Sequence, residues 1–130
     1  MDKTLLVVDR IEEGSRLIDS LSHGRLEVSA AFWLYSTDDE NWSLHIVSPT
    51  IDQIGLRDSY VAIIHAIRAL PDAQIEADDV TLLRTNDPLS VAMLEYLRRH
   101  PSASLTRVWG TFIGDIFIDQ AYIYPEGLNS

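Results

Sequence analysis

The sequence predicts an α+β fold, a mixed or antiparallel sheet of about five to six strands with three helices packed mainly on one face. Apolar residues recur at helical spacing in three segments and alternate with a period of two in two others, and proline and glycine separate these segments. The expected order is β-α-β-β-α-β-α-β-β. A chain of 130 residues, 46% of them hydrophobic, is expected to form a single domain, residues 1–130.

The first elements follow from short local signals. Residues 5–8 end in two valines and favour a short strand. Asp9 and Glu12 have the spacing of a capping box, which predicts a helix that starts at Asp9 and ends before Gly24. A second helix is predicted to end at Pro71, because the residues before it recur at helical spacing: Tyr60, Ile63, Ile64, Ile67 and Leu70.

Alternating apolar residues on either side of the polar turn 37–41 predict a hairpin over 28–47. Pairing Leu34 with Leu44 places the apolar positions on one face, and a slip of one residue would bury the other set. The predicted buried set includes Phe32, Leu34, Leu44 and Ile46. The other face of this register gathers three residues: Trp33, Tyr35 and His45.

The second half of the chain predicts a strand at 80–83 and a third helix. Asp87 is the expected N-cap, Pro88 the first helical residue, and Pro101 stops the helix.

A second hairpin is expected over 105–124, with Gly114 and Asp115 in its turn. Its apolar residues change parity near Asp119 and Gln120, which predicts a β-bulge there.

Composition excludes several classes of protein. The net charge of −10 repels phosphate backbones and argues against direct nucleic-acid binding. The chain has no cysteine, so it forms no disulfide or thiolate metal site. It has neither a secretory signal pattern at its start nor an apolar stretch of about 18 residues, so we expect a cytoplasmic protein that does not enter a membrane.

No residue pattern predicts a catalytic centre, a metal site or a cofactor. The four histidines lack ligand spacing, and the acidic clusters 38–40 and 78–79 lack the alternation and glycine of a calcium loop. The chain contains no phosphate-binding glycine motif and no nucleophile elbow. Arg99 and His100 fit the end of a helix, where positive charge is favourable. We therefore expect a protein that is not an enzyme.

The candidate binding site is the face of the first hairpin opposite the predicted core side, and it is formed by Trp33, Tyr35 and His45. If the helices cover the opposite face, these rings gather where an antiparallel sheet is usually polar, which indicates a contact surface centred on Trp33. The alternatives are that a helix or the C-terminal tail covers this face, or that aromatic residues are there for their strand propensity alone.

Three stretches resemble short single-domain bacterial proteins to which no chemistry is assigned: Ala30–Tyr35, Ser48–Thr50 and Phe117–Tyr124. The resemblance spans most of the chain. It implies a bacterial origin and a single domain, and it transfers no catalytic residue.

Three functions remain open from the sequence. The first is a non-catalytic interaction or self-assembly module, a homo-oligomer or the binder of a protein partner. The second is an acidic inhibitor, such as an antitoxin, an immunity protein or a nucleic-acid mimic, in keeping with the net charge. The third is a small enzyme or small-molecule binder with a pocket between helix and sheet.

Overall fold

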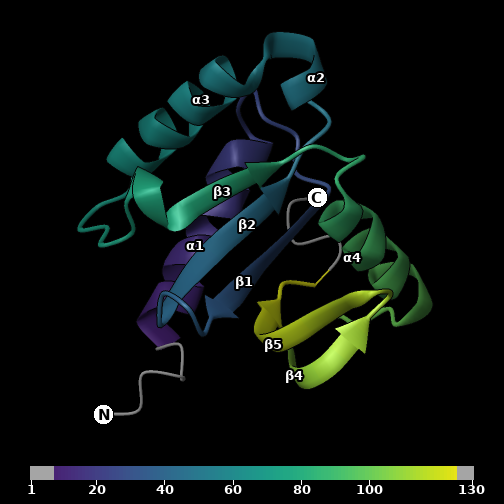
Figure 1. The fold of residues 1–130 in the computed structure, drawn as a ribbon. Coiled ribbons are helices and arrows are strands. Elements are labelled where there is room, and N and C mark those ends of the chain that lie inside the picture. The colour runs from purple at the N-terminus through teal and green to yellow at the C-terminus, as the bar shows by residue number, and fades with distance from the viewer. Residues whose placement is uncertain (1–7, 126–130) are drawn as a thin grey trace.

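The computed structural model describes residues 8–125 and places their helices around one sheet (Figure 1). In chain order the elements are α1 (Val8–Ser22), β1 (Ala30–Ser36), β2 (Asn41–Val47), α2 (Ile51–Ile54), α3 (Leu56–Arg68), the 3₁₀ helix η1 (Ala77–Asp79), β3 (Val80–Leu83), α4 (Pro88–Arg99), β4 (Thr106–Ile113) and β5 (Ile116–Ile123).

The five strands form one mixed sheet in the order β3-β2-β1-β5-β4, which confirms the predicted fold class. β3 runs parallel to β2, and the other neighbouring pairs are antiparallel. The strand predicted at 5–8 lies outside the described residues except for Val8, which is the first residue of α1. Asp9 therefore lies inside the first turn of α1 and is not its N-cap.

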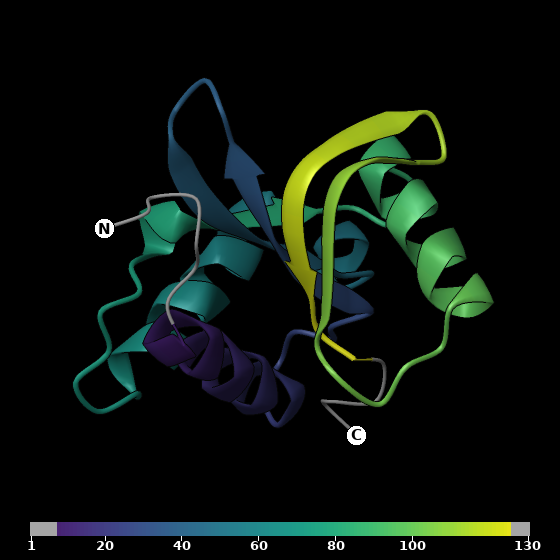
Figure 2. The ribbon, with the colours of Figure 1, turned by 90° about the horizontal axis from the view of Figure 1, so that it is seen from below.

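The helices occupy both faces of the sheet. Figure 2 shows α1 and α3 together on one side of β1 and β2, and α4 on the other side, next to the β4–β5 hairpin. The expectation that the helices pack mainly on one face thus holds for α1 and α3, while α4 packs on the opposite face. The sequence accommodates this because both faces of the first hairpin carry apolar side chains that need cover.

The register predicted for the first hairpin is wrong by one residue. Leu44 lies opposite Trp33, and Leu34 lies opposite Ser43. The two strands therefore contribute one buried set to the α1–α3 side: Ala31, Trp33, Trp42, Leu44 and Ile46. The set buried on the α4 side is Ala30, Phe32 and Val47. The alternation seen in the sequence could not fix the register, because either set can serve as a core face.

The second hairpin has no inserted residue, so the predicted β-bulge is wrong. The pairing of Trp109 with Gln120 and that of Thr111 with Ile118 belong to the same register. Between them Gly110 adopts a left-handed backbone conformation, with φ +58°. The alternation of buried and exposed residues in β4 shifts by one position at Gly110, and the alternation in β5 shifts at the position opposite Gly110. Both strands therefore change their buried side at the same point, which we call the kink, without an inserted residue.

α4 begins as the sequence predicts. The side chain of Asp87 accepts a hydrogen bond from the backbone N–H of Leu89 at 2.9 Å, and Pro88 is the first helical residue. The helix buries Ser90, Met93 and Leu97. Because Met93 and Leu97 pack with residues of β1, β4 and β5, α4 holds the second hairpin against the first.

Candidate functional site

Trp33, the predicted centre of the contact surface, lies in the core with none of its surface exposed. Its indole Nε1 donates a hydrogen bond to Tyr124 Oη at 2.9 Å, and Tyr124 Oη donates to the carbonyl of Ile11 at 2.6 Å. Burial raises the pKa of Tyr124 far above its usual range, so the phenol stays protonated and keeps donating. The guanidinium of Arg10 lies 5.1 Å over the Trp33 ring. Through these contacts Trp33 holds α1 against the sheet.

Tyr35 and His45 do not share a face with each other, because the observed register places them on opposite sides of the sheet. His45 stacks on Phe32 at 5.5 Å, and burial lowers its pKa below the usual value. Both residues line a cleft of about 510 Å³ between the diverging ends of the two hairpins. The prediction of one exposed face made of Trp33, Tyr35 and His45 is therefore wrong, since Trp33 is buried and the other two are partly buried on opposite faces.

A different aromatic surface is exposed on the second hairpin. Trp109 has 64% of its surface exposed, Phe112 66% and Phe117 56%. Phe112 pairs with Phe117 across the strands, their ring centroids 5.3 Å apart. These rings lie on the side of the hairpin opposite Val108, Ile113 and Ile118, which are buried with α4, and Phe112 also borders a pocket beside α4. We call this surface the outer aromatic face: Arg107, Trp109, Phe112, Phe117 and Tyr122.

Arg107 connects the parts of the outer aromatic face. Its guanidinium lies 5.3 Å from the ring of Trp109 and 5.5 Å from that of Tyr122, and it donates to Gln120 Oε1 at 3.1 Å. Stacking of this kind contributes about 0.5–1 kcal/mol at exposed positions. The face therefore combines apolar rings with one fixed positive charge.

The topology explains why these rings stay exposed. Within residues 8–125, β4 is the last strand of the sheet and pairs only with β5. The kink at Gly110 leaves four consecutive residues of β4 exposed, Trp109 to Phe112. Exposed edge strands with apolar side chains are ready sites for pairing with another chain.

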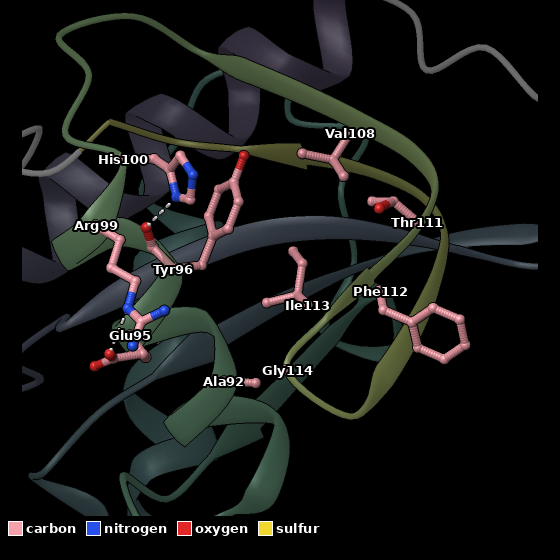
Figure 3. A pocket seen from close by; sticks show the side chains of 10 residues that line it. All are labelled: Ala92, Glu95, Tyr96, Arg99, His100, Val108, Thr111, Phe112, Ile113 and Gly114. Atoms are coloured by element: carbon pink, nitrogen blue, oxygen red, sulfur yellow. Dashed lines mark hydrogen bonds and ion pairs between the residues drawn. The ribbon is translucent and has the colours of Figure 1, made fainter.

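A pocket of about 540 Å³ lies on the opposite side of β4, between this strand and the last turns of α4. Figure 3 shows Tyr96, Arg99 and His100 along one wall and Val108 and Thr111 along the other. The ring of His100 stacks on that of Tyr96 at 4.4 Å and its Nδ1 lies 3.1 Å from the Tyr96 carbonyl oxygen. The size lies within the range of small-molecule sites, about 300–1,000 Å³.

The charges at the mouth of this pocket form a compact group on α4. Glu95 accepts from Arg98 at 2.6 Å and from Arg99 at 2.8 Å. The hydrogen bond from Arg98 holds the pKa of Glu95 below its usual range, so Glu95 remains ionised. One carboxylate thus faces two guanidinium groups on α4, and of these two arginines Arg99 lines the pocket.

Residues 8–125 contain no group of three or more histidine, aspartate and glutamate side chains that could hold a metal ion. In the same residues no helix combines the length and the apolar character needed to cross a membrane.

Comparison with known proteins assigns no family: no protein-family model matches the chain, and neither a curated protein nor a solved structure matches it.

The outer aromatic face was not predicted from the sequence, although one sequence signal indicates it. The parity break that predicted a bulge shows that the second hairpin changes its buried side, as the structure confirms at Gly110. If the change of buried side is placed at Asp119 and at the residue that faces it in β4, the exposed side of the hairpin gathers three aromatic residues: Trp109, Phe112 and Phe117. What the sequence could not reveal is that β4 lies at the edge of the sheet, because strand order depends on contacts far apart along the chain.

Proposed function

We propose that this protein is a non-catalytic module that self-associates through the outer aromatic face of the β4–β5 hairpin. The observation that carries the proposal is the exposure of Trp109, Phe112 and Phe117 together on the last hairpin of the sheet. Aromatic residues are enriched at interfaces and depleted from indifferent surfaces. Self-association through a two-fold axis is the commonest arrangement for a small protein that covers such a face.

The area involved supports an interface of ordinary size. Three aromatic side chains with more than half of their surface exposed present roughly 400 Å² of apolar area. A stable contact buries about 800 Å² on each partner, and an apolar patch of about 300–600 Å² is often functional. The rings would supply about half of the contact, and the edge backbone of β4 would supply part of the rest.

The absence of cysteine supports the reducing cytoplasm as the place of action. The net charge of −10 supports solubility at the concentrations that association needs. Direct nucleic-acid binding and enzymatic activity have no part in the proposal.

Sedimentation equilibrium over a concentration series tests the proposal. The wild-type protein should associate, and Trp109→Ala should weaken association by about 2 kcal/mol or more, as expected for a central aromatic anchor. Leu56→Ala is the matched control, because Leu56 is an exposed apolar residue on α3. A wild-type protein that remains monomeric at high micromolar concentration would refute self-association. Equal effects of the two variants would refute the choice of surface.

A second candidate function is the binding of a small amphiphilic carboxylate in the pocket between α4 and β4. It is favoured by the polar wall of Tyr96, Arg99 and His100 opposite the apolar side chains of Val108 and Ile113. Titration with hexanoate should shift the backbone amide resonances of these residues, and Arg99→Gln should weaken the response. Unchanged resonances at millimolar hexanoate would exclude this ligand class.

A further inference from the structure

The exposed strand β4 has a symmetric pattern of outward and inward side chains. Arg107, Trp109 and Phe112 point to the outer side. Val108 and Ile113 point to the inner side, where both are buried with α4. Thr111 shares that side, because it pairs with the buried Ile118.

The kink at Gly110 is what makes the pattern symmetric. In an unkinked strand side chains alternate, so Trp109 and Phe112, three residues apart, would point to opposite faces. Because the kink shifts the alternation by one residue, Trp109 and Phe112 both point outward, and Val108 and Ile113 both point inward. Each pair is centred on the point between Gly110 and Thr111.

We propose that the self-association uses the free edge of β4: a second copy of this chain pairs its β4 antiparallel with the first β4 about a two-fold axis between Gly110 and Thr111, so that the outer aromatic faces of the two copies meet side by side. This inference rests on the proposed self-association and adds its register. In that register Trp109 of one copy lies opposite Phe112 of the other, and Val108 lies opposite Ile113. All of these pairs match outward with outward and inward with inward residues.

Two other registers fail this match. A shift that places Trp109 opposite Trp109 of the second copy places Arg107, an outward residue, opposite Thr111, an inward one. A shift that places Arg107 opposite Asp115 places Trp109 opposite Ile113, which is buried beside α4. A two-fold axis between Gly110 and Thr111 pairs Trp109 with Phe112 on the outer side and Val108 with Ile113 on the inner side.

Charge complementarity supports the same register. Arg107 of one copy lies opposite Gly114 of the other, so its guanidinium is next to the exposed carboxylate of Asp115. The symmetry repeats this contact at the other end of the paired strands. Two such pairs offset locally the repulsion between two chains that each carry a net charge of −10.

Charge reversal distinguishes this register from self-association in general. Arg107→Asp and Asp115→Arg should each raise the dissociation constant of the dimer about five- to ten-fold, because each places like charges together twice. The double variant Arg107→Asp/Asp115→Arg should restore it to within about three-fold of the wild-type value, because opposite charges meet again. A dimer that shows no restoration would overturn the register and leave the proposed function standing.

Cysteine cross-linking gives an independent reading, since the chain has no cysteine of its own. In the proposed register the two Thr111 residues have Cα atoms about 5–7 Å apart, a separation that a disulfide can bridge. Thr111→Cys should therefore form a covalent dimer under mild oxidation at protein concentrations where the wild type associates. Gln53→Cys, at an exposed position on α2, is the control and should not. A dimeric Thr111→Cys variant that fails to cross-link would overturn the register, and a monomeric wild type would overturn the proposed function itself.

Discussion

The two antiparallel hairpins of this protein carry similar aromatic side chains, but one hairpin buries them and the other exposes them. Both contain tryptophan and phenylalanine on strands of similar length. In the β1–β2 hairpin Phe32, Trp33 and Trp42 are all buried, whereas in the β4–β5 hairpin Trp109, Phe112 and Phe117 are all largely exposed. The first hairpin forms the middle of the core and the second presents its rings to solvent.

The difference comes from the position of each hairpin in the sheet. β1 and β2 are central strands with α1 and α3 on one face and α4 on the other, so apolar residues of either parity are covered. β4 ends the sheet, and α4 covers only its inner side. An aromatic residue in a strand is therefore evidence of a contact surface only when the place of the strand in the sheet is known.

The largest expected effect is a difference in the loss of stability when each of two tryptophans, one in each hairpin, is replaced by alanine. Trp33→Ala should lower the free energy of unfolding by about 3–5 kcal/mol, because it leaves a cavity and removes the partner of Tyr124. Trp109→Ala should change stability by about 0.5 kcal/mol at most, since most of its surface is exposed. Urea denaturation of both variants measures this. Comparable losses at the two positions would contradict the contrast between the hairpins.

The next effect concerns how closely α1 packs against the buried hairpin. Gly14 lies inside α1, where alanine normally stabilises a helix by about 1 kcal/mol. Here a Cβ atom would collide with Tyr124 Oη, which is held by Trp33, so Gly14→Ala should instead destabilise the protein by about 1–3 kcal/mol. Gly24→Ala is the control, since its nearest neighbour would be Leu21 O at 3.5 Å. A higher melting temperature for Gly14→Ala would show that the helix does not sit this close to the sheet.

A smaller effect concerns the helix that covers the inner side of both hairpins. Asp87→Ala should lower the free energy of unfolding by about 0.5–2 kcal/mol, because the N–H of Leu89 loses its acceptor at the start of α4. Asp87→Asn should retain most of the stability, since the amide oxygen can accept the same bond. Chemical denaturation of the two variants at one pH tests whether the cap or the charge matters.

The smallest effect is the dependence of stability on pH through His45. Burial lowers the pKa of His45 from 6.5 in the folded protein, so the unfolded chain binds the proton more tightly. The stability associated with neutral His45 is present above pH 6.5 and is lost as the pH falls through the folded pKa. His45→Gln should lose less stability than wild type between pH 7.5 and pH 5, measured by urea denaturation. His23→Gln, at an exposed position, should behave as wild type.

The sequence predicted what depends on local chemistry. The start of α4 follows from Asp87 and Pro88, and the turn of the second hairpin follows from Gly114 and Asp115. These signals act over a few residues and do not depend on contacts between distant segments.

The features that the sequence did not predict depend on contacts between distant segments. The register of the first hairpin was wrong because Phe32 and Trp33 are both buried, on opposite faces, so alternation favours neither. The candidate site was wrong because helices cover both faces of the first hairpin, so Trp33 is buried on either face. The edge position of β4 is set by the pairing of β5 with β1, whose paired residues are 85 to 91 positions apart in sequence, and no local pattern encodes this pairing.

Quenching of tryptophan fluorescence tests the central claim most directly: Trp109 is exposed in the single chain and becomes shielded when the chains associate. Trp109 is 64% exposed, whereas Trp33 and Trp42, the other tryptophans of the chain, are 0% and 5% exposed. At low protein concentration acrylamide should quench one accessible component, and Trp109→Phe should remove it. As the concentration rises and the chains associate, this component should become protected. A quenchable component that persists in Trp109→Phe, or wild-type quenching that does not change while the protein associates, would contradict the claim.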